Sequence, residues 1–269
     1  MPEGHTLHRF AELHQRRYAG APVAVSSPQG RFAAEAETLD GKVLTDVEAH
    51  GKHLFHHYGR AGAVHVHLGL YGAFAESELP VTAPVGQVRM RMVGATHWTD
   101  LRGPTRCELL SPFEVEAITA RLGPDPLRAD ADPERAGRRI KASRTAIAAL
   151  LMDQSVLAGV GNVYRAEVLF RHGIRPMLPG HALESAVWQD IWADLVTLMR
   201  AGMRTGRIDT VRHEHTPEVS GRAPRNDRHG GEVYVYRRAG MSCLVCGSMV
   251  AHQKFAGRQL YWCPTCQPG

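Results

Sequence analysis

The 269-residue sequence has no apolar run close to the roughly 18 residues that a membrane-spanning helix needs. Its first residues lack the basic segment and apolar stretch that are typical of a secretory signal. We therefore expect a protein that stays in the cytoplasm and binds no membrane. Because disulfides are rare in that compartment, the five cysteines are expected to be thiols or metal ligands.

Most of the chain also lacks an excess of either charge. Residues 1–112 contain 11 Lys and Arg against 11 Asp and Glu, and residues 113–220 contain 14 against 14. The net charge of +5 arises in residues 221–269, which contain 7 basic and 2 acidic residues. Such a segment favours phosphate binding, because it displaces counter-ions from the phosphates. A solvated basic tail has the same composition, so charge alone leaves both interpretations open.

Four of the five cysteines are confined to the end of the chain. Cys243 and Cys246 form one Cys-x2-Cys pair, and Cys263 and Cys266 form another, with 16 residues between the pairs. Four thiolates at this spacing can surround one zinc ion tetrahedrally. Because no coordination position remains for water, we expect one structural zinc ion rather than a catalytic one.

The length predicts more than one domain. After an opening helix from about Thr6 to Tyr18, residues 1–112 consist of short β-favouring runs broken by Gly or Pro, which predicts a β-sandwich or barrel. The following residues show helical spacing. Ser143 is predicted to cap a helix through residues 143–157, and Asn162 is predicted to cap the next one.

The glycines just before Asn162 allow two interpretations. Gly159, Val160 and Gly161 predict accessible backbone N–H groups beside a helix start, which is a common anion site. A tight turn between helices explains the same residues. Residues 208–231 lack periodicity and predict a mobile functional loop or a disordered segment.

The zinc module is expected to begin with a strand, EVYVYRR, at residues 232–238. Between the cysteine pairs, AGRQLYW predicts a hairpin whose turn carries Arg258. An arginine held there is suited to phosphate or base acceptors in a DNA groove. An ordinary surface arginine is the alternative.

The second residue has a particular chemical prospect. Met1 is generally removed when a small residue follows, and this would leave Pro2 with a free secondary amine. Such an amine can attack a carbonyl carbon and form an iminium cation. A frayed terminus without a function is the alternative.

Several motifs follow one another along the chain: the opening PEG, then HGKHL, HLGLYG, LRGP, LGPDPL, DQSVLAGVGNVYRAEVL and the cysteine-containing end with GRQ. Through them the sequence resembles the formamidopyrimidine-DNA glycosylase and endonuclease VIII family over essentially its whole length. The resemblance implies a multidomain α+β fold: an amino-terminal helix and β-sandwich (1–112), a helix–two-turn–helix domain (113–230) and a β-hairpin zinc finger (231–269). It also implies a monomeric, nucleoid-associated bacterial enzyme that excises oxidised bases from double-stranded DNA and cleaves the strand at abasic sites.

The resemblance assigns roles in catalysis to the start of the chain. It implies that Pro2 is the nucleophile and that Glu3 moves protons. Lys52 is implied to be a cation on a strand that holds the phosphate and contacts the departing base, although without the family it would be interpreted as an exposed lysine. A base must leave the duplex before it can be excised. Leu70 and Tyr71 are implied to fill the gap, with the sandwich core as their alternative place.

Gly161, Asn162 and Arg258 are implied to bracket the lesion by holding phosphates. The sequence departs from many relatives at Thr6 (commonly Glu), Gly69 (often Gln) and Leu260 (commonly Thr). The opening PEGHT and the Leu70–Tyr71 pair favour the branch that prefers oxidised pyrimidines.

Three other functions are open. A member of the family specific for oxidised purines and a non-catalytic protein that binds damaged DNA would share this fold. The intact Pro2–Glu3 pair with Lys52 favours catalysis over binding alone. The histidine-rich runs HGKHLFHHY and HVHLG raise a metalloenzyme as a third possibility, but their spacing is that of strand alternation.

Overall fold

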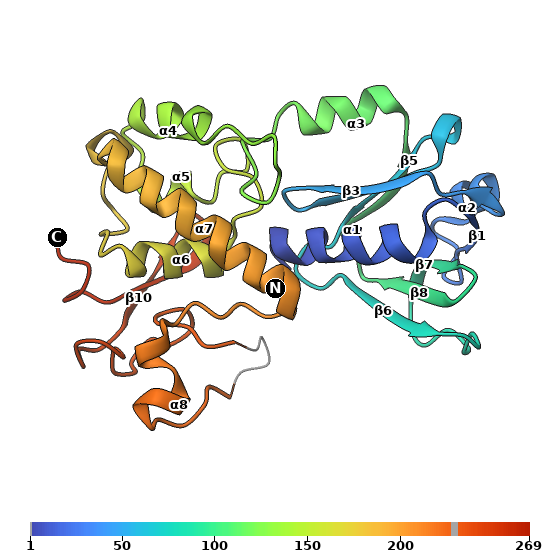
Figure 1. Ribbon diagram of the computed structural model, residues 1–269. Coiled ribbons are helices and arrows are strands. Elements are labelled where there is room, and N and C mark those ends of the chain that lie inside the picture. Colours follow the sequence, from blue (N-terminus) through green and yellow to red (C-terminus); the bar gives the residue numbers. More distant parts are fainter. Residues whose placement is uncertain (1, 227–230) are drawn as a thin grey trace. The chain divides into compact units, whose positions relative to one another are not determined.

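The chain folds into two units, Met1–Arg121 and Leu122–Gly269, each with its own core. The structure is a computed structural model that describes residues 2–226 and 231–269. Figure 1 shows the ribbon, coloured along the sequence from blue to red. In the described part of the chain, no helix is long and apolar enough to cross a membrane.

The first unit contains two antiparallel sheets that share one core, which confirms the predicted sandwich. The strand order is β2-β1-β7-β8-β6 in the larger sheet and β3-β4-β5-β9 in the smaller one. The strands are β1 (Pro22–Ser26), β2 (Lys42–Val43), β3 (Asp46–His50), β4 (His53–His57), β5 (Ala63–His67), β6 (Ala73–Glu78), β7 (Val88–Val93), β8 (His97–Arg102) and β9 (Arg106–Leu110). Along β1, Val23 and Val25 are buried while their neighbours are exposed, as a strand with one face in the core requires.

Helix α1 lies against the smaller sheet. The helices of this unit are α1 (Gly4–Tyr18), α2 (Ala33–Leu39) and α3 (Pro112–Thr119), with the 3-10 helix η1 (Gly59–Ala61). Leu7, Ala11 and His14 are buried, and their spacing of four and three puts them on one face of α1. This face packs on β3 and β4. The predicted opening helix is confirmed, and it begins two residues earlier than expected.

A buried hydrogen-bonded chain ties α1 to both sheets. His14 Nδ1 lies 2.8 Å from His56 Nε2 on β4, and His14 Nε2 lies 2.6 Å from Glu76 Oε1 on β6. At such a distance the nitrogen of one ring donates a hydrogen and the nitrogen of the other ring accepts it, so the two imidazoles cannot both be cationic. Burial lowers the pKa of His56 well below its usual range. The middle of α1 is therefore fixed by a contact that requires a neutral histidine.

A second chain of the same kind runs along the smaller sheet. His53 Nδ1 lies 2.8 Å from His65 Nε2, and His65 Nδ1 lies 3.0 Å from Glu108 Oε1. Burial lowers the pKa of His53 to about 3, and burial also lowers the pKa of His65 in spite of Glu108. These contacts account for much of the histidine-rich sequence. Among the described residues, a group of three or more side chains in metal-binding geometry occurs only at four cysteines.

The second unit is mainly helical and ends in a hairpin. Its helices are α4 (Pro133–Lys141), α5 (Ile147–Leu150), α6 (Asn162–Arg171), α7 (Ser185–Thr205) and α8 (Pro217–Ser220), with the 3-10 helices η2 (Gly180–Ala182) and η3 (His213–His215). The hairpin consists of β10 (Ala251–Phe255) and β11 (Arg258–Trp262). The long helix α7 buries Trp188, Ile191 and Leu195, again at spacings of three and four, and these side chains join the core.

The helix predicted through residues 143–157 is wrong in extent. Only α5 is helical there, and Ser143 is not its cap. The N–H of Ile147 donates to the carbonyl oxygen of Leu178, 2.8 Å away. The Ile147 N–H at the start of α5 is therefore bonded to a residue distant in the sequence. No local pattern could have predicted this contact.

The segment 208–231 is also more regular than predicted, because its described part contains η3 and α8. Residues 227–230 lie outside the described residues, and the mobility of the loop stays a prediction.

Candidate functional site

Pro2 and Glu3 lie directly before the first turn of α1. Glu3 is the N-cap of this helix and is fully buried, but its carboxylate makes no capping hydrogen bond. The partial positive charge at a helix N-terminus favours a carboxylate at this position. Pro2 is half-buried. Met1, whose removal the chemistry requires, lies outside the described residues.

His5 and Thr6 follow Gly4 in the first turn of α1, and neither side chain is charged near pH 7. His5 is buried, and burial lowers its pKa to about 3, so its ring is neutral near pH 7. His5 Nε2 lies 3.3 Å from Thr6 Oγ1. Thr6 thus contacts an uncharged imidazole. The sequence pattern gives no sign of His5.

Lys52 lies in the turn between β3 and β4 rather than on a strand. His50 pairs with His53 at the base of the turn, which leaves Gly51 and Lys52 as its two residues. Gly51 has a φ of 60°, in the left-handed region that favours glycine. The tight turn fixes the backbone position of Lys52, whose side chain is half-buried.

Leu70 and Tyr71 project from the loop between β5 and β6. Their exposed fractions are 46% and 87%, so neither belongs to the sandwich core. The flanking glycines make this turn possible. A Cβ on Gly69 would lie 1.9 Å from Thr105 Oγ1, and one on Gly72 would also clash with backbone. The loop therefore presents an apolar and an aromatic side chain together.

The loop before α6 differs from its prediction. Gly161 is the N-cap of α6, and Asn162 is the first residue of the helix, so the predicted cap is wrong. Asn162 Nδ2 instead donates to the carbonyl oxygen of Gln259, 3.0 Å away on β11. The N–H of Gly159 donates to Gln154 Oε1 at 3.0 Å, so this predicted anion donor is already used.

Arg165, one turn into α6, explains why Asn162 is held this way. It is fully buried, and its Nη2 donates both to Asn162 Oδ1 and, at 3.3 Å, to the carbonyl oxygen of Gln259. Asn162 and Arg165 thus attach the start of α6 to the hairpin residue that follows Arg258. A charge inside the run GVGNVYRAEVLF is the signal that could have revealed this contact, since a buried charge needs partners.

Glu167 fastens the entrance of the zinc module to the same helix. Its buried carboxylate accepts the N–H groups of Tyr234, Val235 and Tyr236 at 2.6, 2.9 and 2.8 Å. It also accepts the hydroxyl of Thr210 at 2.6 Å. The strand predicted from EVYVYRR is therefore wrong, because a side-chain carboxylate takes the donors that a neighbouring strand would have taken.

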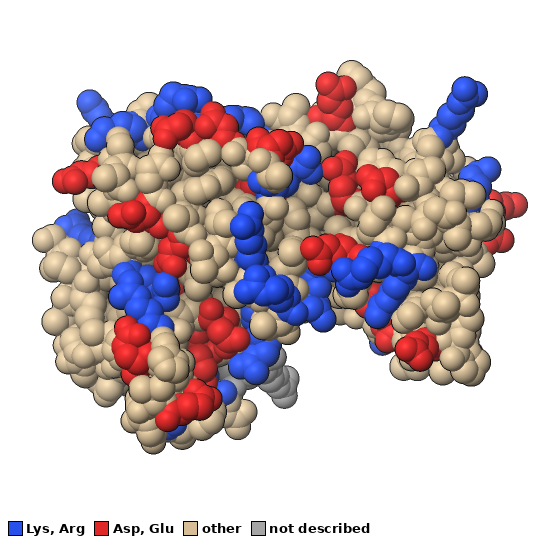
Figure 2. All heavy atoms as spheres, in the orientation of Figure 1, with Lys and Arg blue, Asp and Glu red and all other residues tan. Residues whose placement is uncertain are grey.

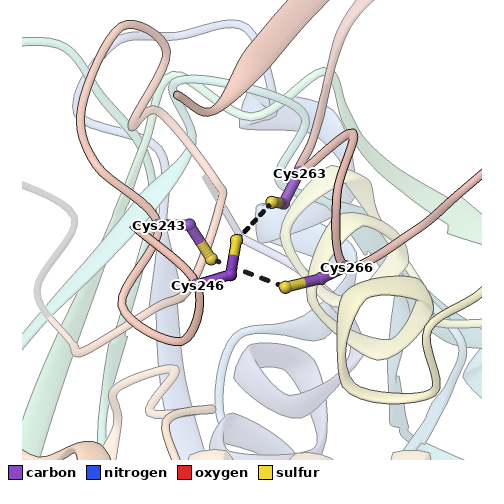
Figure 3. Close-up of side chains that lie close together, drawn as sticks. All are labelled: Cys243, Cys246, Cys263 and Cys266. Atoms are coloured by element: carbon purple, nitrogen blue, oxygen red, sulfur yellow. Dashed lines mark hydrogen bonds between the residues drawn. The ribbon is translucent and has the colours of Figure 1, made fainter. Parts of the chain in front are cut away.

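The four cysteines of the terminal module converge on one point (Figure 3). Their sulfur atoms all lie within 4.8 Å of one another. Burial raises the pKa of Cys263 and of Cys266, so their thiolates need a cation to stabilise them. Four sulfur donors without an open position suit a structural zinc ion. Cys243, Cys246, Cys263 and Cys266 are positioned to bind one zinc ion, as predicted.

Arg258 lies at the tip of the hairpin. It is exposed and is the first residue of β11, paired with Phe255 across the two-residue turn. The turn thus ends just before Arg258 instead of carrying it. Leu260, two residues later, is fully buried in the core of the unit and anchors the strand. Within this unit, the contacts at Gln259 bring Asn162 close to the backbone beside Arg258.

Basic and acidic side chains are interspersed over the face of the molecule that Figure 2 shows.

Three family models match the chain. Residues 1–107 match the formamidopyrimidine-DNA glycosylase N-terminal domain, and residues 122–213 match the formamidopyrimidine-DNA glycosylase H2TH domain. Residues 242–269 match the zinc finger found in FPG and IleRS.

Relatives match over the same span. Endonuclease 8 1 of Mycobacterium tuberculosis is 56% identical over 271 residues, which cover 99% of this chain and 100% of the relative. The formamidopyrimidine-DNA glycosylase of Gloeobacter violaceus is 30% identical over 99% of this chain and 96% of its own length. The structure of Lactococcus lactis Fpg in complex with DNA containing an abasic site has the same fold, with a TM-score of 0.77 at 22% identity over 99% of this chain and 100% of that one.

Proposed function

Because the chain belongs to the formamidopyrimidine-DNA glycosylase and endonuclease VIII family of DNA repair enzymes, we propose that it excises oxidised bases and then cleaves the abasic strand. The observation that carries this proposal is the placement of Pro2 and buried Glu3 at the start of α1. A protein that only binds DNA needs neither an amino-terminal proline nor a buried carboxylate beside it.

In the proposed reaction, the neutral amine of Pro2 attacks C1′ of the damaged nucleotide, and the base leaves with the electrons of the glycosidic bond. Opening of the sugar ring then gives an iminium between C1′ and the Pro2 nitrogen. This cation makes the C2′ hydrogen acidic, so its loss expels the 3′ phosphate. A second elimination expels the 5′ phosphate, and water releases the sugar remnant from Pro2.

Two side chains support these steps. Glu3 protonates the sugar ring oxygen as the ring opens and accepts protons at other steps, a task that suits a carboxylate next to the nucleophile. Lys52, on its tight turn, holds the phosphate of the damaged nucleotide and contacts the departing base.

The DNA contacts use both units. Exposed Leu70 and Tyr71 fill the space that the extruded nucleotide leaves, at a site where unstacking costs a few kcal/mol. Gly161 and Asn162 at the start of α6, and Arg258 on the hairpin, hold phosphates on either side of the lesion. The side chains of Asn162 and Arg165 keep the hairpin backbone in place for this contact.

We propose oxidised pyrimidines as the preferred lesions, because the opening PEGHT and the Leu70–Tyr71 pair resemble the endonuclease VIII branch. The substrate is double-stranded DNA with an oxidised base or an abasic site, and one chain is enough to act on it. Since such DNA is chromosomal, the proposal places the protein in the cytoplasm with the nucleoid. The zinc finger, residues 231–269, then acts as a DNA-contact module beside the helical domain.

The test is reduction with borohydride during reaction with DNA that carries an abasic site. Borohydride converts the iminium into a stable amine and so joins the protein to the DNA. We expect wild-type protein to be trapped, Pro2→Gly to be trapped at least tenfold less, and a chain with an uncleaved amino-terminal tag not to be trapped at all.

Pro84→Gly is the matched control, because Pro84 is an exposed proline of the same unit. It should be trapped like the wild type. Equal trapping of Pro2→Gly and Pro84→Gly would exclude Pro2 as the nucleophile. Binding without trapping by the wild type would support the non-catalytic alternative. A panel of duplexes with single oxidised bases then decides between pyrimidine and purine preference.

A further inference from the structure

The carboxy-terminal unit contains a cavity of about 710 Å³ that is lined by four arginines. Residues 222–226 line one part of it, and residues 237–238 and 241–244, which include the first cysteine of the zinc module, line another. Its arginines are Arg222, Arg225, Arg237 and Arg238. Of the described residues that line it, none is Asp or Glu. The volume suits a small-molecule site, and the lining is strongly positive.

Main-chain oxygens orient the guanidinium groups of buried Arg238 and half-buried Arg225. Arg238 Nη1 and Nη2 donate to the carbonyl oxygens of Tyr234 and Ser242 at 2.5 and 2.8 Å. Arg225 Nη2 donates to the carbonyl oxygen of Tyr236 at 3.1 Å. Such bonds satisfy donors and fix the side chains, but a neutral carbonyl does not cancel the positive charge.

The positive charges also act on one another. Burial lowers the pKa of Arg238, and the charges of Arg222 and Arg225 lower it further, whereas Glu167 and Cys243 oppose this effect. Glu232 forms an ion pair with Arg222 at 2.6 Å. Arg222 and Arg225 therefore disfavour the charged form of Arg238. Glu167 and Glu232 offset part of this effect, and an anion bound in the cavity would offset more of it.

Arg237 has a strained backbone. Its φ is 54°, in the left-handed region where glycine is favoured, and its side chain is exposed. Its guanidinium carbon lies 5.7 Å from the centre of the Tyr236 ring. The nearby Gly240 occupies the same region of backbone space with a φ of 75°. An arginine held in a backbone conformation that glycine adopts more easily indicates that its side chain has a function.

We propose that this cavity binds a phosphate group, with Arg237 as the accessible contact and Arg238 as a fixed, buried positive charge. Arginine suits this task because its planar fork matches phosphate oxygens. The phosphate belongs either to the DNA backbone or to a free phosphate compound. The site does not depend on the chemistry proposed for Pro2, so it can be tested even if that chemistry fails.

The zinc centre offers a rival explanation. Zn²⁺ with four thiolates has a net charge of −2, and Cys243 lines the same cavity. Arginines that only offset this charge would stabilise zinc and would bind no further anion. A test must therefore measure zinc content together with phosphate binding.

The experiment is a calorimetric titration of the zinc-loaded full chain with inorganic pyrophosphate. We expect saturable binding that Arg237→Gln weakens at least tenfold while one zinc ion per chain is retained. Arg237→Gly should weaken binding equally and should raise the melting temperature by about 2 °C, because it relieves the strained φ. A purely structural arginine would give the opposite shift in melting temperature.

Arg175→Gln is the matched control, since Arg175 is an exposed arginine of the same unit that lines a different cavity. It should bind pyrophosphate like the wild type. The proposal is overturned if pyrophosphate does not bind, if the Arg175 and Arg237 variants lose binding equally, or if Arg237→Gln loses zinc.

The salt dependence of DNA binding identifies the source of the phosphate. Loss of one backbone contact lowers the slope of log K against log salt by about 0.9. If Arg237→Gln lowers the slope in this way and Arg175→Gln does not, the ligand is a DNA phosphate. If both slopes equal the wild type while pyrophosphate binding depends on Arg237, the ligand is a free phosphate compound. Pro2→Gly should bind pyrophosphate like the wild type, which separates this site from the chemistry at Pro2.

Discussion

The two units position their candidate residues with different kinds of buried polar group. In the first unit, α1 and the strands are joined by pairs of histidines, such as His14 with His56, in which at least one ring must be neutral. In the second, Arg165 and Glu167 hold the loop, the hairpin and the zinc module through bonds to main-chain atoms. The first arrangement is sensitive to protons. The second depends on retaining particular charges and, at its end, on a metal ion.

The largest effect should come from removing zinc, which breaks the second unit and spares the first. Structural zinc supplies about 10–16 kcal/mol of apparent binding free energy in zinc-finger peptides, far more than a small hairpin can replace. We expect Cys263→Ser to lose zinc and to lose hydrogen-exchange protection in β10 and β11, while β4 and β5 stay protected. Exchange measured by mass spectrometry, with zinc measured by atomic emission, checks this.

Cys107→Ser is the control for that experiment, because Cys107 belongs to the first unit and lies outside the sulfur cluster. It should retain one zinc ion. A protected hairpin in zinc-free Cys263→Ser would show that the hairpin does not need the metal.

Glu167→Gln should have the next largest effect. The amide offers one acceptor oxygen and turns an NH₂ group towards donors that the carboxylate now satisfies. Hydrogen bonds to a charged group contribute about 1.5–3 kcal/mol each, so we expect a loss of about 3 kcal/mol in the second unit. Exchange at Tyr234–Tyr236 measures it. Asp190→Asn, at an exposed position inside α7, should change stability by less than about 0.5 kcal/mol, and an equally small change at Glu167 would contradict this expectation.

Protonation of His56 alone should have a smaller effect, and on the first unit, where the other neutral histidines His5 and His53 add to the total loss on acidification. Folded His56 binds a proton only well below pH 6.5, whereas an unfolded histidine does so near 6.5. Between these values the unfolded state holds more protons, so stability is full above about pH 6.5 and falls by about 1.4 kcal/mol per pH unit below it. At pH 5 the loss from His56 is about 2 kcal/mol.

Exchange protection of β4 and β5, corrected for intrinsic rates, measures this loss. His56→Asn is less stable at pH 7, but it should lose about 2 kcal/mol less than the wild type between pH 7 and pH 5, because it cannot titrate. Parallel losses in the two proteins would show that His56 is not the sensitive group.

Local patterns in the sequence predicted what local forces decide. The period of two along β1 and the helical spacing of α1 reflect which side of each element faces a core. The four cysteine ligands were predictable because metal coordination fixes both the residue type and the spacing.

The failures lie where distant residues compete for backbone donors. The N–H of Ile147 at the start of α5 donates to Leu178, and N–H groups of the expected strand 232–238 donate to Glu167. The side chain of Asn162, the expected helix cap, donates to the backbone of Gln259. No local pattern reports a partner that is 30 to 100 positions away.

The most direct test of the central claim is peptide mapping of the borohydride-trapped adduct by tandem mass spectrometry. The account predicts that the modified peptide begins at Pro2, that Met1 is absent, and that the deoxyribose remnant is on the proline nitrogen. A remnant on Lys52 or another lysine, or an active protein that still carries Met1, would contradict it.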